Sequence, residues 1–499
     1  MSFGDPLYQQ IRGYETPQLN KLAEEGILFS RMLTEPGCTP SRAAVLTGQL
    51  AIRTGTWEIG FPIEYTGFSD ENVTMAEVLS QAGYATALYG KTHLGDIEES
   101  YPHNQGFDEA FWALYNQITS LYNNMGEGAN AIIGMKEELL ADNPYQRDRT
   151  FIQDKAYVFY LEGKKGEQAR EWRDGSQELQ DYKDFDIEAR KRALSFIRTN
   201  AEAKKPFYIA WWPLYTPFIP DAKKVTLQRG LVAESYMRVI EPDIEELRKT
   251  LDELGIAENT LIVAMADNGP MTHNPPQGAG LGEGIFRGGK GDFLEGGVRV
   301  CAAALWPGVI EPGQVVGDMI HLVDLFTTFA RLAGATKYIP TDRIIDGIDQ
   351  TALLMKGDTN GRRDYNFIYA GPTLAATVKD HYKMHWVSKD PSQAAAGLTA
   401  VYDLYNDQRE VNPIVVGGFH MKEPFKRMRA RHELWKEKYP DRHHKRAPAY
   451  TGIANARPET IAISQPPAAM KQLPYDVLQF IEQLDELPYD GGDSSGIGQ

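Results

Sequence analysis

The chain has 499 residues, of which 42% are hydrophobic and 24% are charged, as is typical of a globular protein of about two to four domains. Its 52 basic and 68 acidic residues give a net charge of −16. This balance argues against nucleic acid as a partner, because phosphate binding requires a positive surface, but it allows a small anionic substrate. Two cysteines, Cys38 and Cys301, are too few for a disulfide framework or a cysteine-rich zinc site.

Membrane-spanning and targeting segments are not expected in this chain. No apolar run approaches the roughly 20 residues that cross a bilayer. The first ten residues, MSFGDPLYQQ, lack the basic and apolar regions of a signal peptide. The sequence therefore predicts no membrane span and leaves the localisation open.

Predicted helices and strands alternate through the first two thirds of the chain. Thr16 and Pro17 begin a short amphipathic helix, followed by a strand at 27–29, a helix at 74–82 and a strand at 85–89. The alternation continues with helix 186–203, strand 207–211, helix 231–254 kinked at Pro242, strands 261–266 and 298–305, and helix 321–333. Continuous apolar strands between helices predict an α/β fold with helices on both faces of a central, mostly parallel sheet.

The pattern changes after residue 357. Short strands separated by turn residues predict a smaller antiparallel sheet with a helix, at 367–369, 376–378, 382–387 and 401–404. We therefore expect a catalytic α/β domain over 1–357 and a C-terminal α+β subdomain over 358–499. Residues 120–184 lack periodicity and predict loops, and 491–499 predict a disordered tail.

Cys38 begins the most informative stretch, C-T-P-S-R over residues 38–42, followed by L-T-G at 46–48. It precedes a predicted helix, whose free N–H groups favour an anion, and Arg42 adds a fixed cation. A cysteine at such a position is by itself more often a small buried hydrophobe, but the whole run is far more specific. It resembles the C-x-P-S-R maturation signature of the type I sulfatase family. In that family a formylglycine-generating enzyme oxidises the cysteine to Cα-formylglycine.

Three further motifs follow in the family's order, so the resemblance covers nearly the whole chain. The first, G-K-T-H-L-G over 90–95, follows a predicted strand. The resemblance implies that Lys91 binds the sulfate and that His93 helps to remove a proton when the aldehyde is regenerated. An isolated pair of this kind would more often be a surface lysine and a structural histidine.

The second motif, D-N-G, places Asp267 and Asn268 at the end of a predicted apolar strand. By itself the trio is a common turn. A carboxylate and an amide oxygen suit Ca²⁺ or Mg²⁺, and the resemblance implies that they bind such an ion with the Cys38-derived group.

The third motif, R-G-G-K-G over 287–291, is followed by E-G-G-V-R over 295–299. The resemblance implies that Lys290 contacts the sulfate and protonates the leaving oxygen, whereas a merely solvated loop is the alternative. Together the motifs imply an alkaline phosphatase superfamily fold. They also imply arylsulfatase-like hydrolysis of sulfate esters of small molecules or glycans.

Two departures from the family pattern stand out. Family members begin with an apolar strand that ends in paired aspartates, two further metal ligands, whereas this chain begins M-S-F-G-D. The missing strand predicts a weakened metal site and unpaired ladder partners inside the sheet, and the most economical interpretation is a late-starting gene model. Asp5 is a weak replacement ligand. At Tyr215 many relatives carry a histidine, so sulfate contacts from that segment are expected to differ.

Two alternatives to a sulfatase stay open on the sequence. A phosphate or phosphonate ester hydrolase of the same superfamily would share the Cys38 signature. A non-catalytic relative that binds sulfated ligands would explain the missing aspartates, although an inactive protein has no need of a maturation site. The basic stretch over 426–446 could favour a polyanion, but its neighbouring acidic residues are more typical of a solvated helix.

Overall fold

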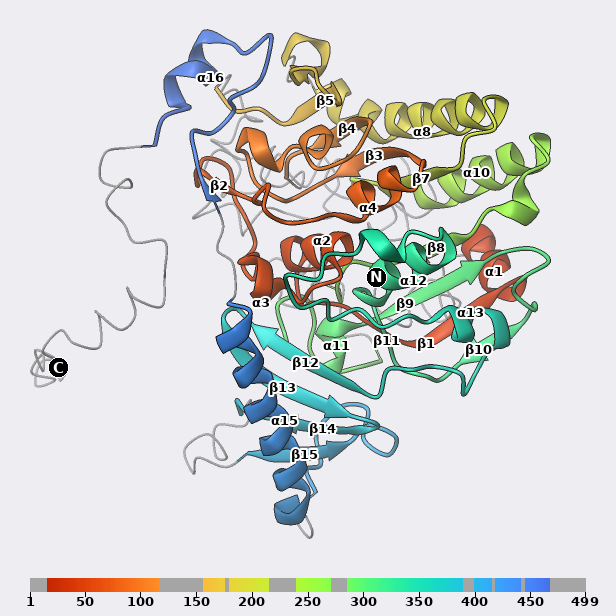
Figure 1. Cartoon of the computed structure of the whole chain (residues 1–499), viewed down its shortest axis with the longest axis vertical. Helices are drawn as coiled ribbons and strands as arrows, with labels where there is room; N and C mark the ends of the chain where they lie inside the picture. The colour runs from red at the N-terminus through yellow and green to blue at the C-terminus, as the bar shows by residue number, and fades with distance from the viewer. Residues whose placement is uncertain are drawn as a thin grey trace, which may run out of the picture.

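A computed structural model describes most of the chain, and Figure 1 shows how its elements are arranged. The described residues are 16–115, 156–175, 179–214, 239–270, 285–388, 399–414, 418–440 and 445–466. Among them, no helix is both long and apolar enough to cross a membrane. The predictions for residues 1–5, 215 and 491–499, and most of 120–184, lie outside these ranges. In the described part of 120–184, strands at 160–164 and 170–171 and a helix from residue 179 replace the predicted loops.

One mixed sheet is built around β1, in the order β10-β1-β9-β8, with β11 also paired to β1. Its strands are β1 (Ile27–Leu33), β8 (Ile262–Met265), β9 (Arg299–Leu305), β10 (Gln314–Val316) and β11 (Ile320–His321). β1 runs parallel to β10 and β11 and antiparallel to β9, which is antiparallel to β8. The predicted strands at 27–29, 261–266 and 298–305 are therefore confirmed, within one to four residues at their ends.

A second mixed sheet has the order β6-β5-β4-β3-β7. Its strands are β3 (Ala85–Lys91), β4 (Glu109–Ala113), β5 (Tyr160–Lys164), β6 (Arg170–Glu171) and β7 (Phe207–Trp212). β3 is parallel to both β4 and β7, whereas β4–β5 and β5–β6 are antiparallel. The α/β class is confirmed, but parallel pairing is less dominant than predicted. The alternation of helices and strands does not exclude antiparallel pairs, because antiparallel neighbours need no crossover helix between them.

β7 and β8 are the strands to compare with the predicted lack of a first strand. Within the described ranges, β7 pairs only with β3 and β8 only with β9. Their residues are mostly half-buried, whereas every residue of β3 and β9 is buried. The sequence predicts unpaired ladder partners where the family's first strand is lacking, and these two edges are the candidates for them.

Helices flank these sheets where the capping residues predict them. Thr16 and Pro17 occupy the N-cap and first positions of α1 (Pro17–Glu24). Thr74 and Glu77 form a reciprocal capping box on α4 (Met75–Gln81). The other helices are α2 (Cys38–Thr47), α3 (Ala51–Thr54), α8 (Leu179–Glu202), α10 (Glu241–Glu253), α11 (Glu295–Val298), α12 (Asp324–Leu332) and α13 (Thr351–Lys356).

The kink at Pro242 stays a prediction, because most of the helix expected before it lies outside the described residues. Pro242 lies in the first turn of α10, which begins at Glu241 directly after two π-helical residues. Proline is tolerated there because the first N–H groups of a helix have no intrahelical partner. Residues 231–238 of the predicted helix lie outside the description. α8 begins seven residues before the predicted start at residue 186.

The C-terminal sheet is an antiparallel meander, as predicted. Its strands are β12 (Tyr365–Ala370), β13 (Thr373–Lys379), β14 (Tyr382–His385) and β15 (Ala400–Asp403), and α15 (Gly418–Lys438) packs on β13 and β15. Figure 1 shows this unit at one end of the molecule. The division at residue 357 remains a prediction.

The last described segment leaves the meander and returns to the N-terminal part. β16 (Lys445–Arg446) pairs with β2 (Thr66–Gly67), and α16 (Pro458–Ile463) follows it. Ala449, Tyr450 and Ile453 belong to the same hydrophobic cluster as residues of β3 and β4. Figure 1 shows this blue segment beside β2, far from the meander. Residues 445–466 therefore pack with the N-terminal part of the chain.

Candidate active site

Cys38 lies at the first position of α2, just beyond the end of β1. Its side chain is buried, with only 3% of the residue exposed. The backbone N–H of Ser41 donates to Gly37 O at 3.0 Å, and the Ser41 hydroxyl donates to Glu35 O at 3.0 Å. The strand-to-helix connection is therefore fixed, and it places Cys38 at the sheet edge where α/β proteins form their sites.

Lys290 is the cation that contacts Cys38 directly. Its Nζ lies 3.1 Å from Cys38 Sγ, although the two residues are 252 positions apart in the chain. The Lys290 N–H donates to Pro270 O at 2.7 Å, and the Gly291 N–H donates to Pro36 O at 2.7 Å. The glycine-rich loop is thus tied to both neighbouring turns and is not merely a solvated loop.

Arg42 joins three of the predicted segments. Its Nε and Nη2 donate to Asp267 Oδ2 at 3.1 and 2.7 Å, and its Nη1 donates to Lys91 O at 2.5 Å. Its guanidinium also lies over the Trp212 ring, 5.1 Å from the centroid. A planar guanidinium can satisfy these contacts together, which a lysine could not do.

Lys91 ends β3, and His93 follows within the same buried stretch. His93 has a left-handed backbone (φ 57°), which is uncommon outside glycine and is typical of functional sites. Its Nε2 lies 2.9 Å from Gly60 O, whereas its buried Nδ1 has no hydrogen-bond partner among the described residues. The preceding Gly90 allows close approach of β7, since a Cβ there would lie 1.7 Å from Trp212 O.

Burial and charge act in opposite directions on the titratable groups of this cluster. Burial and Asp267 raise the pKa of the Cys38 thiol, but Lys290, Lys91 and Arg42 outweigh them, and the net pKa is lowered. Burial likewise raises the pKa of Asp267, and the same three cations hold it well below its usual range. The site therefore stabilises negative charge.

The two other basic groups shift in different directions. Burial lowers the pKa of Lys91, and Arg42 and Lys290 add to the decrease. Burial also opposes the charge of Lys290, but Cys38 and Asp267 lie close enough to raise its pKa overall. Burial and the neighbouring cations lower the pKa of His93 well below its ordinary value, so its imidazole is neutral at neutral pH.

The donor set for a divalent cation fits in part. Asn268 is 5% exposed, and its buried Oδ1 has no hydrogen-bond partner in the described part of the chain, as a metal ligand would. Asp267 precedes it and supplies a carboxylate. However, the described residues hold no group of three or more histidine, cysteine, aspartate or glutamate side chains that could bind a metal.

The structure thus brings all seven predicted site residues together, five of them buried and two, Asp267 and Lys290, half-buried. The sequence reasoning missed Trp212, which packs on Arg42, and the Gly60 carbonyl beside His93. Trp212 ends a parallel strand next to β3, and that position could have singled it out. No motif or strand end in the sequence around Gly60 could have indicated its contact with His93. Tyr215 lies outside the described residues.

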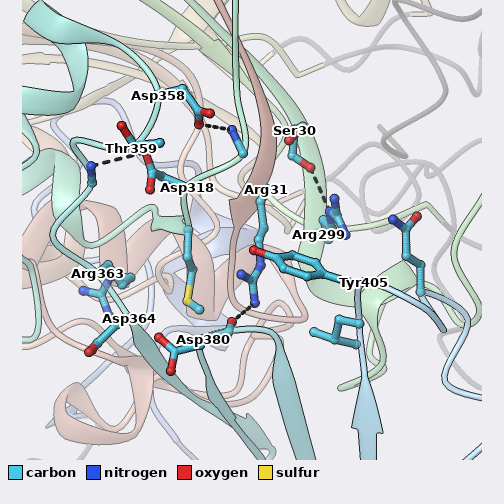
Figure 2. Close-up of a pocket in the computed structure, with 15 residues that line it drawn as sticks. Ser30, Arg31, Arg299, Asp318, Asp358, Thr359, Arg363, Asp364, Asp380 and Tyr405 are labelled. Carbon is cyan, nitrogen blue, oxygen red and sulfur yellow. Dashed lines mark hydrogen bonds between the residues drawn. The ribbon is translucent and has the colours of Figure 1, made fainter.

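A separate cavity of about 480 Å³ lies between β1, the start of β9 and the C-terminal meander. Figure 2 shows Arg31, Arg299, Asp380 and Tyr405 around it. Its described lining includes none of the seven predicted site residues. The candidate active site is therefore distinct from this cavity.

An α/β fold with a buried cysteine, three cations and an Asp-Asn pair at one sheet edge is the arrangement of a hydrolase for anionic esters. The sequence model of the Sulfatase family matches residues 2–335. N-acetylgalactosamine-6-sulfatase from Canis lupus familiaris is 32% identical over 404 residues, which cover 77% of this chain and 70% of that protein. Arylsulfatase from Hemicentrotus pulcherrimus is 29% identical over 407 residues, covering 77% and 64% respectively.

Solved structures agree with these sequence matches. The crystal structure of the PsFucS1 sulfatase from Pseudoalteromonas sp. superposes with a TM-score of 0.73 at 27% identity, covering 89% of this chain and 90% of that one. The chain belongs to the sulfatase family. It is a sulfuric ester hydrolase with the alkaline phosphatase-like fold of that family.

Proposed function

We propose that Cys38, after conversion to formylglycine, is the nucleophile of this sulfatase, and that Arg42, Lys91, His93 and Lys290 are its other catalytic residues. The observation that carries the proposal is the 3.1 Å contact between Lys290 Nζ and Cys38 Sγ, beside the buried cations Arg42 and Lys91. This contact brings a motif near residue 290 onto the C-x-P-S-R signature.

The charge of the cluster suits a sulfate monoester, which is itself an anion. Arg42, Lys91 and Lys290 face one carboxylate, Asp267, and the Cys38 thiol, whose pKa they lower. Formylglycine has no thiol to ionise, so after maturation Asp267 alone among the seven site residues carries a negative charge. The three cations are then available for the substrate and for the charge that develops in the transition state.

The modification supplies the step that a plain cysteine lacks: a hydrated aldehyde offers one hydroxyl for attack on sulfur and a second whose deprotonation releases sulfate. His93 is placed to accept that proton. Its Nε2 donates to Gly60 O, so the neutral ring carries its lone pair on Nδ1, the atom without a described partner. Lys290, next to the reacting group, is placed to protonate the leaving oxygen.

Asp267 and Asn268, with the Cys38-derived group, would hold the divalent cation, Ca²⁺ or Mg²⁺. When bound, such an ion polarises an S–O bond and neutralises oxygen charge. Within the chain, Arg42 orients the Asp267 carboxylate through its two bonds to Oδ2. The unpartnered Oδ1 of Asn268 supports this assignment.

The substrate class is a sulfate ester of a small molecule or a glycan. The relatives are named for N-acetylgalactosamine 6-sulfate, aryl and steryl esters, and these names favour no single alcohol.

Intact mass and peptide mapping of the full-length protein, expressed with and without a formylglycine-generating enzyme, test the modification. We expect an aldehyde at residue 38 only with that enzyme, and turnover of an aryl sulfate only in that sample. Rates on an aryl phosphate and a phosphonate monoester should be far lower. An unmodified thiol in an active sample, or faster phosphonate turnover, would contradict the proposal.

A further inference from the structure

Four buried ionisable side chains form a compact network where the C-terminal meander meets the catalytic part. Lys383, on β14, donates from Nζ to Glu295 Oε1 at 3.0 Å and to Glu410 Oε1 at 2.9 Å. His385 Nε2 lies 2.7 Å from the same Glu410 oxygen. The side chains of Lys383 and Glu410 are fully buried, and that of Glu295 is 1% exposed. None of these residues belongs to the cluster proposed to bind sulfate.

Glu410 reaches from this network into the backbone of the Lys290 segment. Its Oε2 accepts from the Glu295 N–H at 2.6 Å, and its carbonyl oxygen accepts from Arg287 Nη1 at 2.9 Å. The Gly296 N–H in turn donates to Arg287 O at 2.8 Å. One C-terminal residue therefore holds both ends of the loop that carries Lys290.

The same turn supports the Asp267–Asn268 segment. The Gly269 N–H donates to Gly297 O at 2.9 Å, and the Lys290 N–H donates to Pro270 O. The backbone of this turn is closely packed, because a Cβ on Gly297 would lie 2.0 Å from Asp292 O. A shift of residues 295–297 would thus move both the Lys290 loop and the proposed metal-binding turn.

Two features show that stability alone does not account for this network. Buried ion pairs are often no more stabilising than apolar side chains of the same volume. Glu410 also has a left-handed backbone (φ 55°), which costs a non-glycine residue about 1–2 kcal/mol. Both costs are explained if the network serves to fix geometry.

We infer that Glu410, held by Lys383 and His385, is a positioning residue that sets the Lys290 loop and the Asp267–Asn268 turn from the C-terminal unit. The inference rests on the proposed role of Lys290. It assigns the C-terminal meander a direct part in assembling the active site, through hydrogen bonds and not through contact with substrate.

Kinetics of the matured full-length protein test the coupling. Glu410→Ala should lower kcat/KM for an aryl sulfate about 10- to 100-fold, because misplacement by about 1 Å costs that much. Glu410→Gln keeps one acceptor and should recover part of the loss. Lys290→Met should cost more, and the Lys290→Met/Glu410→Ala double variant should lose far less than the product of the single losses. The inference would be overturned if the two single losses multiplied in the double variant, or if Glu410→Ala left kcat/KM unchanged.

A matched control separates positioning from general destabilisation. Asp324 is a fully buried carboxylate that pairs with Arg363 and accepts backbone N–H bonds, as Glu410 does with Lys383. Asp324→Ala should lower the melting temperature about as much as Glu410→Ala does. It should nevertheless leave kcat/KM within about threefold of wild type, and its loss should multiply with that of Lys290→Met in the double variant. If Glu410→Ala does not fold, Glu410→Gln carries the same cycle with a smaller expected loss.

Hydrogen exchange of the unmatured protein provides a readout that needs no turnover. Glu410→Gln should raise amide exchange in the peptides covering 266–270 and 287–297, whereas Asp324→Ala should raise it around 321–350. Unchanged exchange at both catalytic segments would overturn the inference. If instead exchange rises but the matured wild type does not hydrolyse sulfate esters, the proposed function fails while the positioning role stands.

Discussion

Two buried clusters of similar composition serve opposite purposes in this protein. Around Cys38, three cations face one carboxylate and one thiol, and His93 Nδ1 and Asn268 Oδ1 have no described hydrogen-bond partner. Around Lys383, this lysine binds two carboxylates, and Glu410 accepts four hydrogen bonds through its side chain and carbonyl. The first cluster has two polar atoms left for a ligand, whereas in the second the one such atom, Glu295 Oε2, lies 3.7 Å from Arg299 Nη1.

This difference shows how function can be distinguished from support when both are buried and charged. An unsatisfied buried polar atom costs free energy, so it persists where a ligand will satisfy it. A satisfied network rigidifies what it touches. If this distinction holds, substitutions in the Cys38 cluster should reduce activity with little loss of stability. Substitutions in the Lys383 cluster should mainly reduce stability.

The largest expected effect is on chemistry. Cys38→Ala should lower kcat by about 10⁴-fold or more, because it removes the proposed nucleophile. The free energy of unfolding should change by only about 1 kcal/mol, as for a small buried side chain. Cys301→Ala, at the other buried cysteine, is the matched control and should keep wild-type activity. Initial rates on an aryl sulfate measure both, and more than 1% residual activity in Cys38→Ala would refute the assignment.

The next effect is on stability. Lys383→Met should lower the free energy of unfolding by about 3–5 kcal/mol, because it removes the cation that binds both buried carboxylates. Glu410 then keeps only His385, and Glu295 only Arg299 at 3.7 Å. Denaturant titration followed by circular dichroism measures the change. A loss below about 1 kcal/mol would mean that the network is not the supporting element that its geometry indicates.

Lys91→Met should produce the reverse pattern. We expect kcat/KM to fall about 10²- to 10³-fold, as when one charge-stabilising donor is removed. The unfolding free energy should stay level or rise by about 1 kcal/mol, since burial and neighbouring cations already disfavour the charged lysine. The activity and denaturation assays, run on Lys91→Met and Lys383→Met together, compare the two clusters directly. A marked loss of stability in Lys91→Met would show that the two clusters do not differ in this way.

The smallest effect is pH dependence. Burial opposes the charge of Glu410, but Lys383 and His385 outweigh it and lower its pKa to about 2 from an ordinary 4.5. A depressed carboxyl pKa contributes stability above pH 4.5 that is lost as the pH falls towards 2, about 3 kcal/mol at most. Glu410→Gln should therefore show a flatter loss of stability in that window. Parallel curves for wild type and variant would show that the charge of Glu410 contributes little.

Much of the fold followed from local sequence signals. The Thr16–Pro17 start of α1 and the helix after Thr74 depend on neighbours in the chain, so the sequence predicts them well. The role of Pro242 stays undecided, because the same residue fits a helix start or a kink and only the preceding chain decides. Strand order, including the antiparallel β8–β9 pair, depends on long-range packing that periodicity does not report.

What the sequence by itself determined is the set of candidate site residues. Cys38 and Arg42 share one helix, and Lys91, Asp267 and Lys290 each lie in a short motif, and the resemblance of these motifs to the sulfatase family was sufficient to select them. Only the tertiary structure decided how these motifs are held. Glu410 binds the backbone of Glu295 from 115 residues away, and Lys383 reaches the Glu295 side chain across 88. Such contacts leave no local pattern, because they depend on how distant elements pack and not on the residues beside them.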